Sequence, residues 1–259
     1  MDIIVCVKRT PLTQEVDLEI DGTKRDIKKD PLAWFINEWD NYAIEAAVQL
    51  KEKFDGTVTA VTIGHEDDEE VLRRCLAIGA DRAVRIDPGN LALDAYLISS
   101  ILAEFIRGLK YDLILTGVQG SDLNNGMVGT MLAEHLGIAH SAVVTGIEAE
   151  GTALKIKMEL EGGIDELARI ALPALLTIQT GINEPRYVSI MGIRKASKKE
   201  LNVIRAEDLI PAKEALVPWT FVEEVYQPPE TEGAAMMEGD PEKIADEIIR
   251  IIKEKGVDL

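Results

Sequence analysis

Cysteine and histidine are scarce in this sequence, and their scarcity narrows the chemistry that the chain can perform. The two cysteines, Cys6 and Cys75, lie in apolar segments without the spacing of metal ligands. They are typical of buried free thiols in a reducing compartment. The three histidines are scattered, and the motifs G-x-S-x-G and H-E-x-x-H are missing. We therefore expect no metal site and no hydrolase of the classes that these motifs mark.

Long apolar runs and an excess of positive charge are also missing. No apolar run approaches the ~20 residues that span a bilayer, and Met1 leads directly into a strand-like segment, so no signal peptide is visible. The net charge of −18 argues against binding to nucleic acid or to an anionic membrane. We expect a cytoplasmic protein without direct membrane insertion. Its 259 residues, 46% of them hydrophobic, fit one large domain or a domain with an appended arm.

The most informative stretch covers residues 111–137. A short apolar run at 113–115 predicts a strand that is buried on both faces of a parallel sheet. A loop rich in glycine, asparagine, aspartate and serine follows at 117–126, and apolar residues then recur at helical spacing up to Gly137. A strand, a glycine-rich loop and a helix in this order present backbone N–H groups to a phosphate. The alternative is an ordinary surface loop, because the stretch matches neither G-x-G-x-x-G nor a P-loop.

Strands and helices alternate from residue 1 to about residue 140. The predicted strands are residues 3–7, 57–63, 83–86 and 113–115. Of the four predicted helices, the first ends at about residue 54 and the others cover residues 67–79, 94–109 and 127–136. Asn37 or Asp40 is the expected cap of the first helix. This order predicts a doubly wound α/β fold, a parallel sheet with helices on both faces. Lys8 and Arg9 follow the first strand, where open sheets of this kind bind ligands, and the alternative for these two cations is an ordinary solvated loop.

The alternation then stops. Residues 143–150, 153–160, 164–171 and 175–180 are strand-length pieces separated by turn residues, with no helix between them. We expect them to form an antiparallel extension at the edge of the sheet. Another hairpin is expected over residues 16–27, where the turn pair Asp-Gly lies between alternating residues.

Residues 188–195 present apolar side chains in a loop-like context and are followed by lysines. The segment indicates either a short helix that packs Ile190 and Ile193 inward, or an exposed apolar anchor for a partner protein. A strand is expected at 201–204.

The C-terminal part of the chain differs in character from the rest. Residues 206–239 lack regular periodicity and contain several prolines, so this arm either is mobile or wraps a partner. Asp240 and the proline after it begin an amphipathic helix. We expect a nucleotide-binding domain over residues 1–205 and, over 206–259, an arm and helix that dock on a partner subunit.

Several segments together resemble the beta subunit of electron transfer flavoproteins. The most specific are A-x-G-A-D-R at the end of the second predicted helix and N-E-P-R-Y after the fourth strand of the extension. The similar segments are 5–9, 37–47, 76–82, 117–129, 159–163, 172–174 and 183–187. The resemblance covers residues 1 to about 205 in order, whereas the tail is similar only in character. It implies a flavodoxin-like, adenine-nucleotide-binding domain that forms a heterodimer with an alpha subunit.

The resemblance also implies a cofactor site. In that family FAD is held mainly by the alpha subunit, and the beta subunit binds AMP or, in electron-bifurcating members, a second FAD. The matching cofactor-binding positions are Cys6, Asn37, Glu38, Trp39, Asp40, Ile63, Gly117, Val118, Gln119, Gly120, Ser121, Asp122, Leu123, Asn124, Asn125, Gly126, Met127 and Val128, with Glu159 near the flavin between the subunits. The segment that matches the docking loop for acyl-CoA dehydrogenases contains Ile190, Met191, Ile193 and Lys195.

The function implied is that of an electron carrier between flavin dehydrogenases and a downstream acceptor, with the redox chemistry supplied by flavin. Two alternatives stay open. One is a subunit of an electron-bifurcating, NADH-dependent complex with a second FAD in this chain; Val128 matches such members, but their G-D-T-A-Q run is missing. The other is an unrelated adenine-nucleotide binder of similar fold. Residues 120–124, GSDLN, replace a run that usually carries several acids in the family, and this departure leaves the choice between AMP and FAD open.

Overall fold

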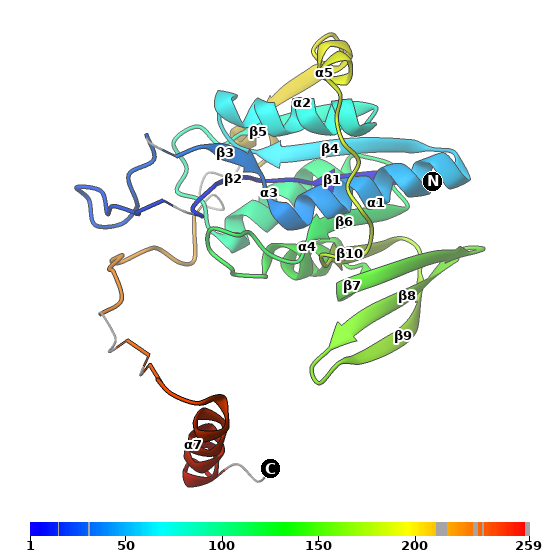
Figure 1. Ribbon diagram of the computed structural model, residues 1–259. Coiled ribbons are helices and arrows are strands. Elements are labelled where there is room, and N and C mark those ends of the chain that lie inside the picture. The colour runs from blue at the N-terminus through cyan, green and yellow to red at the C-terminus, as the bar shows by residue number, and fades with distance from the viewer. Residues whose placement is uncertain (15, 31, 211–216, 230–232, 235, 257–259) are drawn as a thin grey trace.

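A computed structural model describes residues 1–256 of the chain, except 15, 31, 211–216, 230–232 and 235 (Figure 1). Within these residues the main sheet has nine strands in the order β11-β5-β4-β1-β6-β10-β7-β8-β9, and β2 and β3 form a small ribbon. The strands are β1 (Asp2–Cys6), β2 (Arg9–Pro11), β3 (Trp34–Ile36), β4 (Thr57–Ile63), β5 (Arg82–Asp87), β6 (Leu113–Gly117), β7 (Ala139–Glu150), β8 (Ala153–Leu160), β9 (Ile164–Ala171), β10 (Ala174–Ile178) and β11 (Leu201–Arg205). The helices are α1 (Glu38–Phe54), η1 (Glu66–Asp68), α2 (Glu69–Ile78), α3 (Ala95–Arg107), α4 (Val128–Leu136), α5 (Ile190–Ala196), α6 (Ala206–Leu209) and α7 (Pro241–Glu254).

The β-branched runs form the centre of the sheet, as predicted. β1 pairs in parallel with β4 and β6, and β4 pairs in parallel with β5. Side chains alternate along β1, so that Ile3 and Val5 join the core under α1 and α2, whereas Ile4 and Cys6 join the core under α3 and α4. The predicted doubly wound α/β fold, with helices on both faces, is confirmed.

Three of the expected helix boundaries are confirmed by their backbone and side-chain geometry. The Asp94 carboxylate accepts the N–H of Leu97 at 2.8 Å and begins α3. Gly137 ends α4 in the left-handed conformation, with φ of 65°. Asp240 caps α7 by accepting the N–H of Glu242.

Asn37 is confirmed at the cap position of α1, but it does not cap the helix through its side chain. Asn37 occupies the position before the helix, but among the described residues its side chain accepts no capping hydrogen bond. The Asn37 amide is used instead to hold a distant loop, and Asp40 lies inside the first turn of α1.

The antiparallel extension is confirmed for β7, β8 and β9 and is wrong for the last of its four predicted strands. β10 pairs in parallel with β6 and with the start of β7, inside the sheet. β6 and β7, which α4 connects, are not neighbours in the sheet, and β10 lies between them. All residues of β10 are buried, which fits a central strand and not an edge.

The hairpin expected over residues 16–27 is also wrong in extent. In the described part of this segment only the single bridge between Ile20 and Ile27 forms. Val16 and Leu18 are exposed, so the segment has no buried face that would fix the register of two strands.

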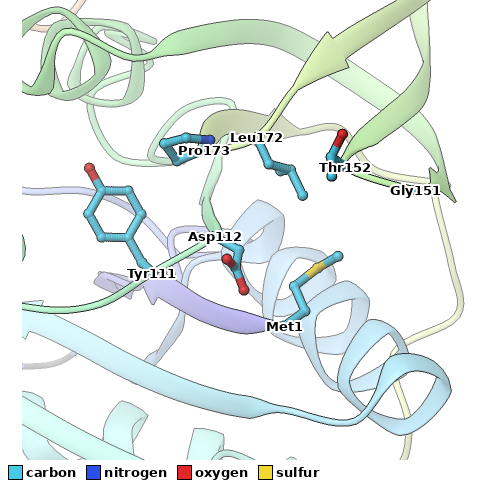
Figure 2. A pocket seen from close by; sticks show the side chains of 7 residues that line it. All are labelled: Met1, Tyr111, Asp112, Gly151, Thr152, Leu172 and Pro173. Atoms are coloured by element: carbon cyan, nitrogen blue, oxygen red, sulfur yellow. The ribbon is translucent and has the colours of Figure 1, made fainter.

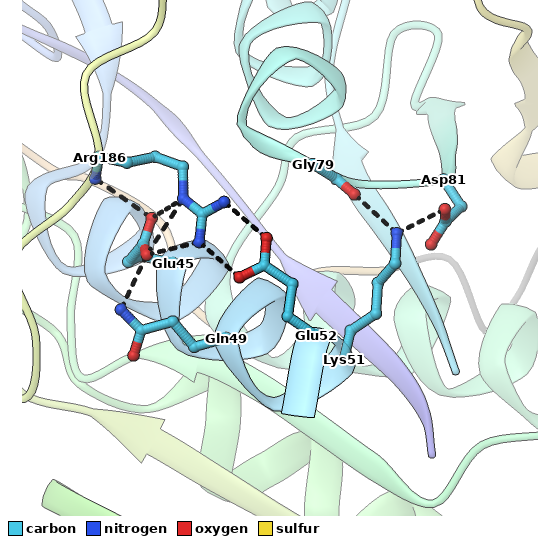
Figure 3. A network of polar contacts seen from close by, with 7 residues as sticks. All are labelled: Glu45, Gln49, Lys51, Glu52, Gly79, Asp81 and Arg186. Atoms are coloured by element: carbon cyan, nitrogen blue, oxygen red, sulfur yellow. Dashed lines mark hydrogen bonds and ion pairs between the residues drawn. The ribbon is translucent and has the colours of Figure 1, made fainter. Parts of the chain in front are cut away.

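The N-E-P-R-Y motif connects β10 to α5 and crosses over α1 (Figure 1). Arg186 donates to the carboxylates of Glu45, at 2.9 Å, and Glu52, at 2.8 Å, which both lie on α1 (Figure 3). The Glu52 carboxylate has the larger effect on the pKa of the Arg186 guanidinium and the Glu45 carboxylate the next largest, and both raise it. Asn183 donates to the carbonyl of Tyr42 at 3.0 Å. The motif is therefore a polar strap that fixes the connection between the centre and the edge of the sheet.

The C-terminal part begins on the domain and then leaves it. Ala206 and Ile210 are buried in the core under α3, and α7 stands apart from the sheet (Figure 1). Between them, the N–H groups of Trp219 and Thr220 donate to Asp94, and the Trp219 ring stacks on the ring of Tyr96 with centroids 3.7 Å apart. Residues 211–216, 230–232, 235 and 257–259 of the predicted arm and helix lie outside the described residues. No described helix has the length and hydropathy of a membrane span.

Candidate functional site

The strand order of the sheet reverses direction between β1 and β6. β4 and β5 lie on one side of β1, and β6 and β10 lie on the other. The carboxyl ends of these strands share one edge, because Cys6 lies opposite Val61 and Val5 lies opposite Leu115. Ligands of open α/β sheets bind at such a switch point. The ends of β1, β4 and β6 and the start of α1 therefore bring most of the predicted cofactor-binding residues together.

Asn37 is the residue that joins these segments most directly. Its side chain donates to the carbonyl of Gln119 at 2.8 Å and accepts the N–H of Ser121 at 3.0 Å. Its own N–H donates to the carbonyl of Lys8 at 2.8 Å. Asn37 is only 1% exposed, so its amide faces the protein and holds the loop after β6 against the end of β1.

Asp40 makes a second connection between the same segments. One carboxylate oxygen accepts the N–H of Lys8 at 2.7 Å, and the other accepts the N–H of Gly117 at 2.9 Å. Burial raises the pKa of Asp40 to about 7, although hydrogen bonding from Asn37, Lys8 and Gly117 favours the charged form. A Cβ atom at position 117 would lie 2.4 Å from Asp40 Oδ1, so only glycine fits there. We call the pair Asn37 and Asp40 the clamp.

The loop held by the clamp closes over the end of β1. Lys8 Nζ lies 2.5 Å from an Asp122 carboxylate oxygen, and Ser121 Oγ lies 3.2 Å from Thr10 Oγ1. At Gly120 an added Cβ would lie 2.7 Å from Asp122 Oδ1 and 3.4 Å from Lys8 Nζ, so the loop packs closely around this ion pair. The cation that follows the first strand is therefore paired with the loop.

The far side of the loop is open. Leu123, Asn124, Asn125, Gly126 and Met127 are all exposed. Asn124 and Gly126 have positive φ values of 51° and 61°, which bend the backbone just before α4. Within the described residues, no side chain caps the start of α4. Its first-turn N–H groups can therefore serve an anion.

The remaining predicted positions lie around this loop in different environments. Cys6 is buried, and burial raises the pKa of its thiol, so it is an unreactive part of the wall. Trp39 donates from Nε1 to Gln179 Oε1 at 2.8 Å, and Glu38 is exposed. Ile63, Val118 and Val128 are half-buried.

Glu159 is not part of this cluster. Val144 pairs with Ile178 at the carboxyl end of β10 and with Met158 of β8, so Glu159 reaches the same edge of the sheet, but β10 and β7 lie between its strand and β6. Its side chain is exposed on the extension. This position leaves Glu159 accessible to a partner rather than to a ligand in the loop.

The predicted docking segment forms the helix α5. It shows features of both alternatives, because it is a short helix and its apolar side chains are exposed. The segment is a short helix, but Ile190 and Ile193 point outward, with exposures of 79% and 51%. Met191 is 71% exposed, and Lys195 is exposed. The inward packing expected for the helical alternative is wrong, because Ala196 supplies the buried contact of the helix. α5 lies against α2, away from the glycine-rich loop (Figure 1).

A surface pocket of about 340 Å³ lies at the opposite end of the sheet (Figure 2). It is lined by residues at the amino ends of β1 and β6 and around the start of β10, namely Met1, Tyr111, Asp112, Gly151, Thr152, Leu172 and Pro173. None of the predicted site residues lines it. Within the described residues, no group of three or more His, Cys, Asp or Glu side chains is arranged to hold a metal ion.

Two contributors to the site were not assigned from the sequence. Lys8 was recognised only as a cation after the first strand, and Gln179, the partner of Trp39, follows the strand that was placed at the edge. The position of Lys8 after a buried strand was a usable signal. For Gln179 there was none, because its contact depends on where β10 inserts.

Sequence comparison with known proteins identifies a family that this chain matches. The model of the electron transfer flavoprotein domain matches residues 29–209. The chain is 38% identical over 258 residues to the electron transfer flavoprotein subunit beta of Bacillus subtilis (strain 168), covering 99% of each protein. It is 38% identical over 262 residues to the corresponding subunit of Methylophilus methylotrophus, covering 98% of each.

A further relative belongs to a larger assembly. The chain is 32% identical over 264 residues to the caffeyl-CoA reductase-Etf complex subunit CarD of Acetobacterium woodii, covering 99% of this chain and 100% of the relative. The matched segment contains the clamp, the glycine-rich loop and α5. The chain therefore belongs to the electron transfer flavoprotein beta subunit family.

Proposed function

We propose that this chain is the adenine-nucleotide-binding half of a heterodimeric electron carrier. It pairs with an alpha subunit, holds AMP at the carboxyl edge of its sheet, and shares an FAD that the alpha subunit mainly holds. Electrons pass through this FAD from flavin dehydrogenases of the acyl-CoA type to a downstream acceptor. The observation that supports this function best is the clamp, which fixes the glycine-rich loop that leads into the start of α4.

The residues at this edge fit an adenylate. The first-turn N–H groups of Val128, Gly129 and Thr130 favour a phosphate, because the start of α4 has no capping side chain among the described residues. The exposed loop over 123–127 supplies further backbone groups. FAD supplies the redox chemistry when bound, and the residues of this chain bind, orient and exclude water. The clamp contributes by positioning the loop, since its own polar atoms are already paired.

Two exposed apolar elements account for the protein partners. The apolar stripe of α7, which contains Ile244, Ile248, Ile251 and Ile252, docks on the alpha subunit, and Ile248 of this stripe is 43% exposed. The outward side chains of α5 dock on a dehydrogenase, because apolar residues surrounded by charge allow binding that is specific and rapidly reversible. Glu159 faces the flavin between the subunits.

The second candidate is a subunit of an electron-bifurcating complex with a second FAD in place of AMP. The similarity to the CarD subunit over its full length favours it, as does Val128 in the loop. The third alternative, an unrelated adenine-nucleotide binder, loses its support because the chain belongs to the family.

Analysis of the bound nucleotides distinguishes these candidates. The chain is co-expressed with its alpha subunit, the heterodimer is denatured, and the released nucleotides are identified by mass spectrometry. We expect equal amounts of FAD and AMP. Two FAD molecules per heterodimer support the bifurcating candidate, and a colourless heterodimer without nucleotide contradicts both.

Electron delivery needs a separate experiment. The heterodimer is mixed with an acyl-CoA dehydrogenase and its substrate, and the flavin absorbance is followed. We expect bleaching that depends on both the dehydrogenase and the acyl-CoA. Reduction by NADH alone supports the second candidate instead.

A further inference from the structure

The docking helix α5 is too short to keep its position through its own hydrogen bonds. It has seven residues, and helices of fewer than about 12 residues are marginal in water without outside contacts. Among its residues, all of which the structure describes, Ala196 alone is buried, whereas Ile190, Met191 and Ile193 are exposed. The position of these exposed side chains therefore depends on the contacts that flank α5 in the chain.

The end of α5 is fixed to α2 by two cationic side chains. Arg73 of α2 donates to the carbonyls of Ala196, at 3.2 Å, and Lys199, at 2.6 Å. Lys199 Nζ donates in return to the carbonyls of Leu76, at 3.1 Å, and Ala80, at 2.8 Å. Each cation thus binds carbonyls at or just after the end of a helix, where partners within the helix are missing.

The start of α5 is held by few apolar contacts. Ser189 Oγ accepts the N–H of Gly192 at 3.1 Å and caps the helix. Among residues 183–195, all of which the structure describes, Val188 alone is buried. Tyr187, directly before it, is 90% exposed. The connection from β10 to α5 therefore depends on polar contacts to stay on the domain.

Arg186 supplies these contacts through both its side chain and its backbone (Figure 3). Its guanidinium donates to Glu45, at 2.9 Å, and to Glu52, at 2.8 Å, and its backbone N–H donates to Glu45 at 3.2 Å. The Glu45 side chain is 3% exposed and also accepts Gln49 Nε2 at 2.8 Å. Because the guanidinium is a planar fork and Glu45 is buried among donors, the pair fixes the direction of the chain at Arg186 as well as its position.

We propose that Arg186 is a positioning residue for electron delivery, because it holds α5 in the arrangement that a flavin dehydrogenase binds. This inference rests on the electron-carrier function proposed above. A segment that is ordered before docking loses less conformational entropy on binding than a segment that becomes ordered during binding. Arg186 thereby increases the affinity for the dehydrogenase through the exposed side chains of α5, without a contact of its own.

The contacts at the two ends of α5 differ in how selectively they can be removed. Arg73 and Lys199 bond to backbone carbonyls and also complete the end of α2, so their replacement affects α2 itself. Arg186 bonds to side chains of α1, so its replacement leaves the backbone hydrogen bonds of α1 in place. Arg186 is therefore the better position for a test.

The test replaces both members of the buried pair, because an unpaired Glu45 carboxylate would destabilise the fold by itself. The strap variant combines Arg186→Met with Glu45→Gln in the flavin-loaded heterodimer, and a purified acyl-CoA dehydrogenase with its substrate donates the electrons. We expect the KM of the dehydrogenase for the heterodimer to rise ~10-fold, which corresponds to about 1.4 kcal/mol, with kcat and flavin content unchanged. Hydrogen exchange over residues 187–195 should accelerate. An unchanged KM overturns the proposal.

Lys51→Met is the matched control. Lys51 also connects α1 to a neighbouring segment, since its Nζ donates to the Gly79 carbonyl at 3.0 Å and to Asp81 at 2.6 Å (Figure 3). This variant removes a cation beside α1 but leaves the contacts of Arg186 in place, so we expect the KM to change less than about twofold. Equal increases of the KM in the strap variant and in Lys51→Met would indicate a general loosening of α1 and overturn the proposal.

A double-mutant cycle with Ile190→Ala separates positioning from general stability. If Arg186 acts through the position of Ile190, the loss of the Ile190 side chain matters less once the strap is removed. We expect Ile190→Ala to raise the KM about fivefold in the wild type and less than about twofold in the strap variant. Effects that multiply as independent factors contradict a positioning role and overturn the proposal.

Two milder variants keep the proposal testable if the strap variant does not fold. Arg186→Lys keeps the charge but not the planar fork, and Glu52→Gln removes the carboxylate that is 55% exposed while the pair with Glu45 remains. We expect each to raise the KM about two- to fivefold at unchanged flavin content, and wild-type KM values in both overturn the proposal. Failure of the wild-type heterodimer to accept electrons removes the proposed function itself, and this outcome is distinct because it needs no variant.

Discussion

Two aspartates, Asp40 and Asp94, each connect distant segments of the chain, but Asp40 is buried and Asp94 is only half-buried. Asp40 accepts backbone N–H groups from Lys8 and Gly117 and joins the first strand to the glycine-rich loop. Asp94 accepts backbone N–H groups from Trp219 and Thr220 and joins the C-terminal arm to α3. Both therefore use one carboxylate to connect segments that are far apart in the sequence.

The two aspartates differ in burial, and their ionisation differs accordingly. Burial raises the pKa of Asp40 to about 7. Burial also acts on the half-buried Asp94, but its backbone hydrogen bonds prevail and hold its pKa below the usual range. A similar set of donors thus gives opposite shifts, because the desolvation cost grows with burial. The connection made by Asp40 is buried in the core, whereas the connection made by Asp94 is partly exposed to water.

The largest effect on stability is expected where the core connection is tightest. Gly117→Ala places a Cβ 2.4 Å from Asp40 Oδ1 and 2.6 Å from the Cβ of Trp39. We expect a loss of about 3 kcal/mol in the free energy of unfolding, together with loss of the bound nucleotide. Thermal unfolding and nucleotide release measure the two effects. Gly22→Ala is the control, since no heavy atom of the described residues lies within 4 Å of its added Cβ. Equal unfolding midpoints for the two variants would rule out the tight fit.

The next prediction compares how the contributions of Asp40 and Asp94 to the free energy of unfolding depend on pH. Asp40 has a pKa of about 7 in the folded chain and about 3.9 in the unfolded chain. The folded chain therefore binds the extra proton between these values, and stability declines as pH rises from about 4 to 7. Asp40→Asn lowers the free energy of unfolding by about 2 kcal/mol at pH 5, because the amide accepts fewer N–H groups. The difference in free energy of unfolding between this variant and the wild type narrows toward pH 8.

Asp94→Asn should show the opposite trend. The folded pKa of Asp94 is depressed, so its stabilising contribution is present near neutral pH and is lost as pH falls through that value. Urea unfolding of both variants between pH 3 and pH 8 measures the two trends. Parallel pH profiles for Asp40→Asn and Asp94→Asn would show that burial does not separate the two carboxylates.

A smaller effect is expected from the stacked pair on the arm. Trp219→Ala removes the stack on Tyr96, whose ring centre is 3.7 Å away. We expect about 1 kcal/mol of local stability to be lost, and hydrogen exchange to accelerate over residues 217–229. Phe221→Ala is the control, because that side chain is 82% exposed. If both variants exchange alike, the stack does not hold the arm on the domain.

The smallest effect on stability is expected at α5. Ile190 is 79% exposed, so Ile190→Ala changes the free energy of unfolding by less than about 0.5 kcal/mol. We nevertheless expect the KM for an acyl-CoA dehydrogenase to rise about fivefold, which corresponds to about 1 kcal/mol of lost docking, at unchanged flavin content. Val203→Ala, on the exposed strand β11, is the matched control. Unchanged electron transfer would show that Ile190 is not the docking anchor.

Much of the fold followed from local patterns. The buried strands and the alternation of strands and helices needed only hydrophobic periodicity. Asp94, Gly137 and Asp240 marked helix ends because caps act within one turn. The family resemblance brought together the residues around the glycine-rich loop, and the structure gathers most of them at one edge.

Other predictions failed because their outcome depends on distant segments. The strand-length run at 175–180 looked like another edge strand, but the strand that forms there, β10 (174–178), lies between β6 and β7. Asn37 looked like a helix cap, but its amide is engaged by Gln119 and Ser121, more than eighty positions away. A local pattern specifies that a side chain is polar and where a helix starts, but not which distant backbone group reaches it first.

The amino-acid sequence by itself determined the alternating elements, the buried apolar runs, and the polar, glycine-rich loop, since these depend on spacing along the chain. The tertiary structure alone decided which strand fills the space beside β6, which aspartate is buried enough to hold its proton, and which isoleucines of α5 stay exposed. The physical reason is that strand pairing, desolvation and exposure are set by neighbours that the fold brings together from far apart in the chain.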